Sequence, residues 1–542
     1  MEAVTRRRVT GTGLAAFALS SLVVVRADAA PRVRYDGHAI ARVTAPDHVP
    51  LEAFVETLEG MGLESLADRP SDRLMVRVPP HARPSLDAAG FAYEIVEPDL
   101  QASLDAEALR VATRPAAEDA YFDDFRPLDE VYARLDALEA TGSDVTAIEV
   151  GTSLEGRPIR GLRFERDPTT PVVLINACQH AREWLSVTTA MGIAEALATR
   201  DSAPIDDTSF ADPDAAAQLD ALLDEVSFII VPVVNPDGYV FTWDDDRLWR
   251  KNRQSEHGVD LNRNWATAWG GPGSNDNAQS NNYRGESAFS EPETAALRDL
   301  MLAEERLVAH VDLHTYGQLV LYPWGWSDAV SPDDDVLAPL AEDVATTITA
   351  AFGVEYEPRR AGSWYAASGN LMDWSYGELG LRALTIELRP DEDIDHAVGF
   401  IPSAAQIRPT ADEAILAVLA LARWTAGAPE LEPGDDGDAP IPEDEPEDDG
   451  EPEVPTGDGT GSEDGTTGTL APPDEPDAGE TGSDPPANGD DGSGEGCACR
   501  TSSRPSSIGM WALVALFVRR RRRGRPSARA SRLVRVSHWR WS

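Results

Sequence analysis

A histidine and a glutamate stand three residues apart, directly after a short apolar run of the sequence. Val172 to Ile175 is rich in β-branched residues, which is typical of a strand that is buried on both faces. His180 and Glu183 follow the end of this strand. Two histidines and one glutamate, with water in the fourth position, form the ligand set of a catalytic zinc site. A third ligand would therefore have to come from a neighbouring strand.

We predict that the third ligand is His314, which ends a second strand-like run beginning at Leu307. Taken alone, a His-x-x-Glu pair is mostly a chance pattern, and a lone histidine in an apolar run is more often a satisfied core residue. Further polar motifs, in order along the chain, favour the metal site. These are Leu248–Arg253, Gly258–Trp265, Leu313–Gln318, Tyr365 and Thr385–Arg389.

Together these motifs resemble, in order and spacing, the zinc metallocarboxypeptidases of the pancreatic carboxypeptidase A type. The resemblance covers residues 118–426. It implies an enzyme that hydrolyses the C-terminal peptide bond of peptides and proteins. It also implies one zinc ion, held by His180, Glu183 and His314.

The resemblance implies two catalytic residues besides the metal ligands. Glu387 would take the proton of the attacking water, and Arg253 would stabilise the oxyanion. Glu387 lies in the apolar run that begins at Ala383, where a buried carboxylate is otherwise costly. The alternative for this residue is a buried ion pair, with Arg389 as the partner.

An exopeptidase must also recognise a free C-terminal carboxylate, for which a planar guanidinium is well suited. By the resemblance, Arg263 beside Asn262 forms this clamp and Tyr365 closes over the substrate. The resemblance also implies further substrate-binding positions. These are Arg182, Thr315, Tyr316 and Phe400.

One side chain at the base of the specificity pocket decides which C-terminal residue such enzymes accept. By the resemblance this position is Met372, with Thr385 and Ala367 lining the same pocket. Methionine offers no charge to pair a buried ammonium, so we expect a preference for hydrophobic and aromatic residues. Arg359 and Arg360 lie close in sequence, and the alternative is that they admit acidic residues.

Two other functions stay open at this point. Cleavage of peptidoglycan stem peptides by the same fold is the alternative among enzymes. A catalytically inactive module that binds at the cell surface is the alternative outside enzymes.

The composition limits the partners of the chain. The 542 residues carry a formal net charge of −47. Even outside the most acidic stretch the chain remains acidic, which argues against nucleic acid as a partner. Three cysteines cannot form a disulfide framework, and Cys178 is expected to be a small buried residue.

The order of strand-like and helical runs predicts the fold of residues 118–426. A strand-like run at 226–234 and a helical run at 292–307 are examples of this alternation. We predict an α/β domain with a mixed, largely parallel central sheet and helices on both faces. In such sheets ligands bind at the carboxyl ends of the strands, where His180, Asn235 and His314 fall.

The N-terminal part predicts export and a separate small domain. Residues 1–29 have the basic, apolar and small-residue regions of a signal peptide. Residues 31–115 alternate strand and helix signals, as in a small α+β domain. Its end resembles the linker of carboxypeptidase zymogens, so we predict an intramolecular pro-segment. The alternative is an unrelated accessory domain.

The C-terminal part predicts attachment to the cell surface. Residues 427–496 are acidic and rich in Pro and Gly, and should form an extended spacer. Residues 497–523 combine Cys497 and Cys499, a short apolar run and an arginine cluster. They resemble the sorting signal of myxobacterial surface proteins, which implies contact with a membrane. The basic extension 524–542 has no explanation.

Overall fold

The computed structural model describes residues 33–46, 49, 51–66, 73–114, 118–200, 215–363, 365–391 and 399–426. The predicted signal peptide, acidic spacer, C-terminal sorting signal and basic extension lie outside these ranges. Within the described ranges, no helix is both long and apolar enough to cross a membrane.

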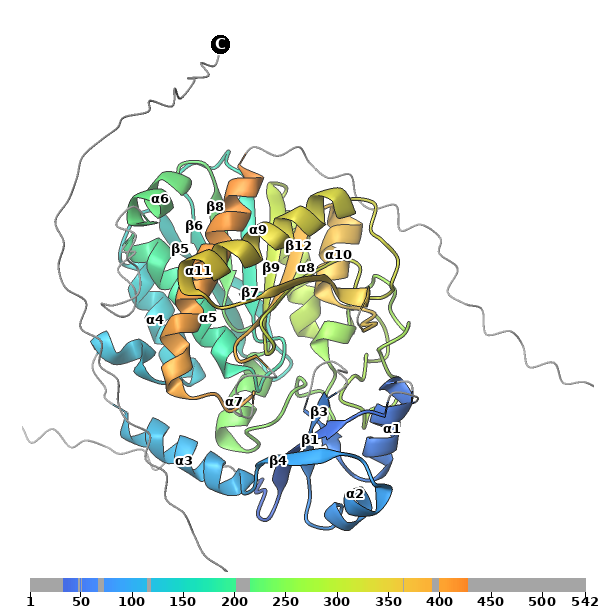
Figure 1. Ribbon diagram of the computed structural model, residues 1–542. Coiled ribbons are helices and arrows are strands. Elements are labelled where there is room, and N and C mark those ends of the chain that lie inside the picture. Colours follow the sequence, from blue (N-terminus) through green and yellow to red (C-terminus); the bar gives the residue numbers. More distant parts are fainter. Residues whose placement is uncertain are drawn as a thin grey trace, which may run out of the picture. The chain divides into compact units, whose positions relative to one another are not determined.

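An eight-stranded mixed sheet forms the centre of residues 118–426, in the order β11-β10-β12-β9-β7-β8-β6-β5 (Figure 1). Its four middle strands β12, β9, β7 and β8 run parallel. The strands are β5 (Val145–Thr152), β6 (Pro158–Phe164), β7 (Val172–Ala177), β8 (Ser227–Val231), β9 (Leu307–Thr315), β10 (Leu319–Tyr322), β11 (Glu357–Arg360) and β12 (Arg382–Leu388).

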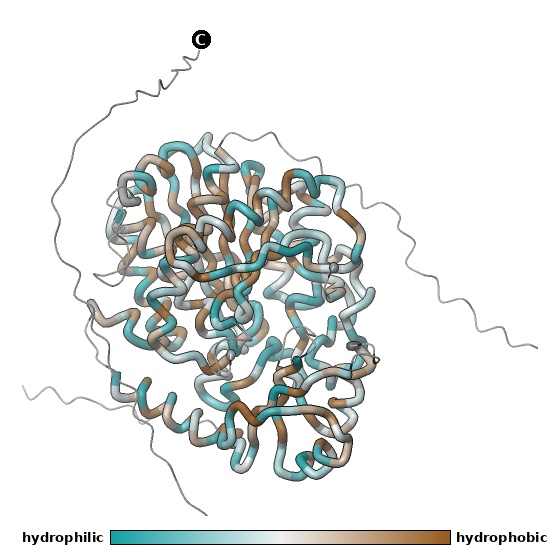
Figure 2. Tube along the Cα trace, viewed as in Figure 1, coloured by the Kyte–Doolittle hydropathy of each residue, from teal (hydrophilic) through white to brown (hydrophobic). Residues whose placement is uncertain are grey.

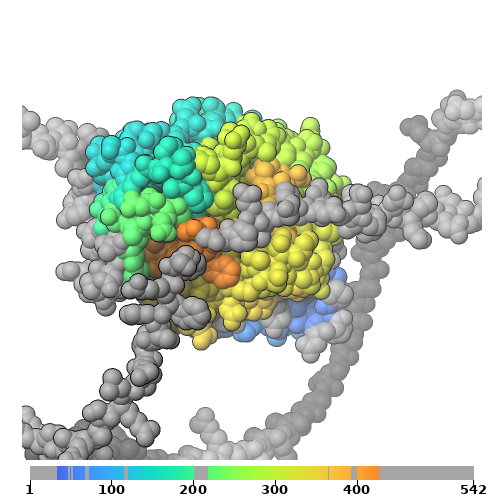
Figure 3. All heavy atoms as spheres, turned by 90° about the horizontal axis from the view of Figure 1, so that it is seen from above, coloured from blue at the N-terminus to red at the C-terminus, as the bar shows by residue number. Residues whose placement is uncertain are grey.

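Helices cover both faces of this sheet. The helices are α4 (Leu128–Glu139), α5 (Trp184–Thr199), α6 (Ala215–Leu222), α7 (Pro236–Asp244), α8 (Pro292–Ala303), α9 (Asp334–Phe352), α10 (Leu371–Leu379) and α11 (Ile407–Thr425). Helix α11 packs against α5 and α9, and α9 (yellow) and α11 (orange) lie side by side in the space-filling view (Figure 3).

Strand β7 shows why both faces must be covered. Val173 and Ile175 belong to the hydrophobic core that includes α5 and α11, whereas Val172 and Leu174 belong to the core that includes α8 and α10. Successive side chains of a strand point to opposite faces, so a strand without polar alternation is buried on both. Each such side chain contributes roughly 1.5–3 kcal/mol when fully buried. Hydrophobic residues therefore gather along the central strands (Figure 2).

A second sheet is formed by the N-terminal segment, residues 33–114. Its four antiparallel strands have the order β2-β3-β1-β4. The elements are β1 (Ala39–Thr44), α1 (Leu51–Gly60), β2 (Glu64–Ser65), β3 (Arg73–Val78), α2 (Arg83–Ala89), β4 (Tyr93–Glu97) and α3 (Leu100–Thr113). Helices α1 and α2 pack on one face around Phe54, Leu58 and Leu86.

The predicted fold class is confirmed, with two differences in detail. The helical run at 292–307 ends at Ala303, because Leu307 already begins β9. The stretch that resembles a zymogen linker is a regular helix, α3, whose first turn is capped by Asp99 accepting from the Ala102 amide.

Candidate metal centre and substrate pocket

Two parallel strands bring the predicted metal ligands together. His180 follows β7 and His314 lies near the end of β9, and these two strands are neighbours in the sheet. Glu183 is the residue before helix α5 and makes no side-chain cap hydrogen bond, so its carboxylate turns toward the histidines. All three side chains are buried. The carboxyl ends of parallel strands thus place the three residues at one edge, as predicted.

The donor atoms of this group converge. Nδ1 of His180 lies 2.7 Å from Oε1 of Glu183, and Nδ1 of His314 lies 3.1 Å from Oε2 of Glu183 and 3.1 Å from Nδ1 of His180. In the described part of the chain, this is the one group of three or more His, Cys, Asp or Glu residues that could hold a metal ion. Two imidazole nitrogens and a carboxylate fit Zn²⁺.

A second carboxylate stands behind each histidine, and the sequence analysis did not identify either of them. Asp260 Oδ1 lies 3.1 Å from Nε2 of His180, and Asp312 Oδ2 lies 2.8 Å from Nε2 of His314. Both Nε2 atoms therefore face an acceptor, which leaves the Nδ1 lone pairs for the metal. The signal for Asp312 was its position two residues before His314 in a strand, which puts both side chains on one face.

Glu183 is also held by the main chain. The amide of Thr315 donates to Oε2 of Glu183 at 3.1 Å. The backbone of Thr315 thus orients a metal ligand, and its predicted contact with substrate stays a prediction.

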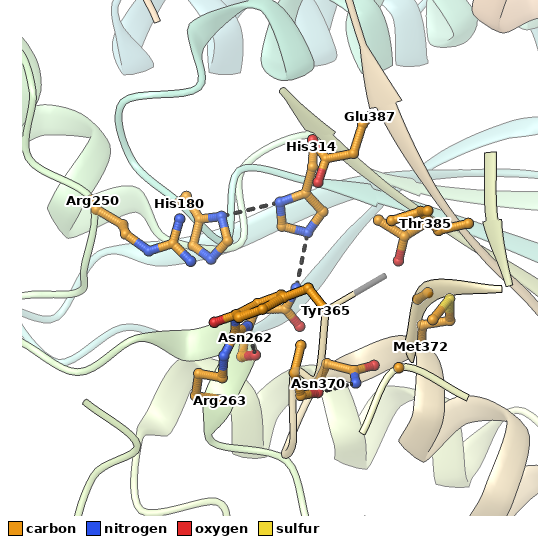
Figure 4. A pocket seen from close by; sticks show the side chains of 14 residues that line it. His180, Arg250, Asn262, Arg263, His314, Tyr365, Asn370, Met372, Thr385 and Glu387 are labelled. Carbon is orange, nitrogen blue, oxygen red and sulfur yellow. Dashed lines mark hydrogen bonds between the residues drawn. The ribbon is translucent and has the colours of Figure 1, made fainter. Parts of the chain in front are cut away.

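A pocket opens beside the metal group (Figure 4). Six of the eleven predicted catalytic and substrate-binding residues line it: Thr385 and Glu387 of β12, Met372 of α10, and Asn262, Arg263 and Tyr365. Its lining is His180, Arg250, Asn262, Arg263, His314, Leu321, Gly325, Ala361, Tyr365, Ala367, Asn370, Met372, Thr385 and Glu387.

Glu387 reaches the metal group through sheet register. It is the partner of His314 across the parallel pair β9 and β12. Arg389, the alternative ion-pair partner, instead contacts Glu413 of helix α11, with Nε 3.0 Å from each carboxylate oxygen. Arg389 is therefore paired with Glu413 and not with Glu387, and Glu387 lines the pocket.

The comparisons with known proteins agree with this site. Residues 131–417 match the protein family described as zinc carboxypeptidase. Zinc carboxypeptidase A 1 of Anopheles gambiae is 30% identical over 414 residues, which cover 74% of this chain and 92% of the relative. Carboxypeptidase A1 of Mus musculus is 32% identical over 413 residues, which cover 72% of this chain and 95% of the relative. The chain belongs to the zinc carboxypeptidase family.

The fold of this zinc carboxypeptidase is also that of a solved relative. The crystal structure of carboxypeptidase A from Helicoverpa armigera matches 73% of this chain and 98% of its own, with 28% identity and a TM-score of 0.63. The protein is therefore a metallocarboxypeptidase, a hydrolase that uses one zinc ion. His180, Glu183 and His314 are the group that can hold this ion.

The structure corrects one residue of the predicted catalytic set of this carboxypeptidase. Arg253 does not line the pocket; its guanidinium lies over the rings of Phe241, at 3.6 Å, and Trp249, at 4.6 Å. Arg250 lines the pocket in its place. The carbonyl of Arg250 accepts from the amide of Ala181, so the backbone beside the metal ligand His180 sets which of the two arginines points inward.

The two residues of the expected carboxylate clamp are held by main-chain groups of Gly273 and of Leu371, the first residue of α10. Arg263 donates from Nε to the carbonyl of Gly273 at 2.9 Å, and Asn262 accepts from the Leu371 amide at 2.9 Å. The Tyr365 hydroxyl lies 3.4 Å from the same Gly273 carbonyl. These contacts place a guanidinium, an amide and a phenol around one side of the pocket.

Three of the expected substrate-binding residues form a separate cluster, here called the outer set: Arg182, Tyr316 and Phe400. The Arg182 guanidinium lies 4.0 Å from the centre of the Phe400 ring, and the rings of Tyr316 and Phe400 meet edge to face at 5.1 Å. None of the three lines the pocket. All three are buried, and Leu66 and Met75 of the N-terminal segment share a hydrophobic cluster with Tyr316 and Phe400.

Polar contacts also join the N-terminal segment to the region of the outer set. Glu107 of α3 accepts from Nε of Arg247 at 2.7 Å, and both side chains are buried. The same arginine donates to the carbonyls of Arg182, at 3.0 Å, and Phe400, at 2.6 Å. The Tyr35 hydroxyl donates to Asp246 at 2.6 Å.

Proposed function

We propose that this zinc carboxypeptidase removes C-terminal residues from peptides and proteins and prefers hydrophobic and aromatic ones. The observation that carries the proposal is the apolar base of its pocket. Met372 is buried there, beside Leu321, Ala361 and Ala367. The thioether of Met372 packs well against an aromatic ring, whereas an unpaired buried ammonium would be strongly unfavourable.

The charged groups near this base do not favour a charged substrate. Arg359 pairs with Glu357, and Arg360 donates to Asp328 at 2.9 Å; neither arginine lines the pocket. Both pairs argue against the alternative that these arginines admit acidic residues.

Asp373 follows the pocket residue Met372, and its carboxylate is held by hydrogen bonds within the protein. Its carboxylate accepts from the amides of Gly325, at 2.8 Å, and Trp326, at 2.8 Å, and from Asn370 at 2.6 Å. Burial raises the pKa of Asp373 to about 6. These contacts leave it unsuited to pair a Lys or Arg side chain of a substrate. The same apolar base argues against the charged diamino acid of a peptidoglycan stem peptide.

Within this proposal Glu387 is the general base. It takes the proton of the attacking water and then delivers it to the leaving amine. The zinc ion that His180, Glu183 and His314 would hold would make the attacking water more acidic and polarise the scissile carbonyl. Arg250 donates to the oxyanion that develops on that carbonyl, replacing Arg253 in this role.

The free carboxylate of the substrate is recognised by Arg263 and Asn262. A guanidinium binds a carboxylate through two parallel hydrogen bonds, which also fixes the register of the scissile bond over Glu387. Tyr365 also lines the pocket and supplies a hydroxyl to the bound substrate.

We further propose that the N-terminal segment is an inhibitory pro-segment. The proposal is supported by the buried outer set and by the Glu107–Arg247 pair. Activation would follow a cut near Arg110 rather than Arg114, because Pro115 follows the latter. Arg110 lies inside α3 and pairs with Asp124, so this helix must unwind locally before a protease can cut it.

Export by the signal peptide 1–29 and attachment through residues 497–523 complete the proposal. Both rest on the sequence alone.

The specificity is tested by measuring kcat/KM for blocked dipeptides that differ only in a C-terminal Phe, Leu, Lys or Arg. We expect Phe and Leu to be cleaved well and Lys and Arg poorly, by an enzyme that loses activity when zinc is removed. Similar values for Phe and Arg would show that Met372 does not set the preference.

A further inference from the structure

A buried polar cluster lies beside Nε2 of His314, which also has Nδ2 of the pocket residue Asn262 at 3.2 Å. At its centre is Asp312, which is fully buried. Its carboxylate accepts from Nδ2 of Asn176 at 2.7 Å, from Nε2 of Gln179 at 2.6 Å and from Nε2 of His314 at 2.8 Å. A buried carboxylate with three N–H donors is fully committed to one position.

The two amides that hold Asp312 are themselves fixed. Oδ1 of Asn176 lies 2.6 Å from Nε2 of His310, and Oε1 of Gln179 accepts from the indole of Trp265 at 3.1 Å. Since each amide oxygen has a donor, each NH₂ group must face Asp312. Burial lowers the pKa of His310 to about 4, so its ring is neutral near pH 7 and can donate from Nε2. The whole cluster therefore presents N–H donors to one carboxylate.

Asp260, behind the other histidine ligand, has a different set of partners. It accepts from Nη2 of Arg250 at 3.0 Å and from the amide of Asn262 at 2.9 Å, besides its contact with His180. Its negative charge is thus shared with a guanidinium. The amides that hold Asp312 are neutral, so the charge of Asp312 acts mainly on His314.

We propose that Asp312, clamped by Asn176 and Gln179, is a positioning residue that sets the zinc affinity of this carboxypeptidase. By accepting from Nε2, it fixes the tautomer in which Nδ1 of His314 carries a lone pair toward the metal. Its charge also makes the imidazole a stronger donor. The inference rests on His314 being a zinc ligand.

The test is the dissociation constant for zinc, measured on the full-length protein by competition with a chelator. Asp312→Asn removes the charge and turns an NH₂ group toward donors that already point inward. We expect zinc to bind about 10–100-fold more weakly. Asp237→Asn is the matched control, because Asp237 is also buried and accepts from Ser153, the Glu155 amide and Arg157, but does not line the pocket. This control should leave the zinc affinity unchanged.

A second variant keeps the test valid if Asp312→Asn does not fold. Gln179→Met removes one donor to Asp312, together with the acceptor of the Trp265 indole, and leaves the carboxylate in place, so it should weaken zinc binding in the same direction by a smaller factor. When zinc is saturating, KM of the Gln179→Met variant should equal that of the wild type. Unchanged zinc affinity in the folded variants, or an equal loss in the Asp237→Asn control, would overturn the proposal.

One further measurement separates this proposal from the ligand assignment. His314→Ala should abolish tight zinc binding and change the visible spectrum of the cobalt-substituted protein. If His314→Ala binds zinc as tightly as the wild type, the ligand set is wrong, whatever the Asp312 variants show. If His314→Ala loses zinc and Asp312→Asn does not, only the role of Asp312 is wrong.

Discussion

The pocket and the outer set are two parts of one expected substrate site, but they differ in which parts of the chain surround them. The pocket is formed by residues 118–426 alone and reaches the metal group (Figure 4). Tyr316 and Phe400 of the outer set pack in one hydrophobic cluster with Leu66 and Met75 of the N-terminal segment. The difference indicates that the catalytic centre is already assembled in the full chain. Under the proposal that the N-terminal segment is inhibitory, the segment would limit the access of a longer peptide.

The largest expected effect on the pocket comes from replacing its general base, Glu387. Glu387→Gln should reduce kcat by roughly 10²–10⁴-fold, the usual scale for general acid–base catalysis. Zinc content, measured by atomic absorption, should stay at one ion, since Glu387 is the sheet partner of His314 and not a member of the metal group. Substantial activity at full zinc content would assign the base to another residue.

Two arginines in one short segment provide a matched pair. Arg250→Ala should reduce kcat by about 10²–10³-fold, which corresponds to about 2.7–4 kcal/mol of transition-state stabilisation. Arg253→Ala should have little effect on kcat, because the Arg253 side chain stacks on Phe241 and Trp249 away from the pocket. A larger loss of kcat in Arg253→Ala than in Arg250→Ala would assign the stabilisation of the oxyanion to Arg253.

The base of the pocket can be given a charge. Met372→Asp should lower kcat/KM for a C-terminal Phe and raise it for Arg, changing the ratio by about 10–200-fold. The physical reason is that a buried carboxylate is costly until a substrate cation pairs with it. Met372→Leu is the control and should keep the preference for Phe. An unchanged ratio in the aspartate variant would place the specificity elsewhere.

The smallest expected effect concerns the contact between the N-terminal segment and the region of the outer set. Glu107→Gln removes one charge of the buried pair with Arg247 and should loosen the N-terminal segment. We expect the uncut protein to gain about tenfold in kcat/KM on a longer peptide, equivalent to about 1.4 kcal/mol. Asp105→Asn changes an exposed carboxylate of the same helix and should leave this rate unchanged. Equal effects of both variants would argue against the pair as a latch.

The sequence predicted the parts of the site that depend on local pattern. The ends of β7, β9 and β12 follow from their apolar runs, and with them the meeting of His180, His314 and Glu387. The choice between Arg250 and Arg253 could not be made, because both lie in an irregular segment whose direction is set by a hydrogen bond to Ala181.

Contacts between distant parts of the chain were also beyond the sequence. Glu107 and Arg247 are separated by 140 residues, and no local pattern pairs them. Asp312 was within reach of sequence reasoning, because it shares a strand face with His314. It was missed because the role of a carboxylate in an apolar strand cannot be inferred until its hydrogen-bond partners, here two side-chain amides, are known.

The most direct test compares two substrates on the same preparation, before and after a cut in α3. One is a blocked dipeptide ending in Phe, which needs mainly the pocket; the other is a longer peptide with the same C-terminus, which also needs the outer set. We predict that the cut raises kcat/KM for the longer peptide by a clearly larger factor than for the dipeptide. Equal kcat/KM for the longer peptide before and after the cut would contradict the account.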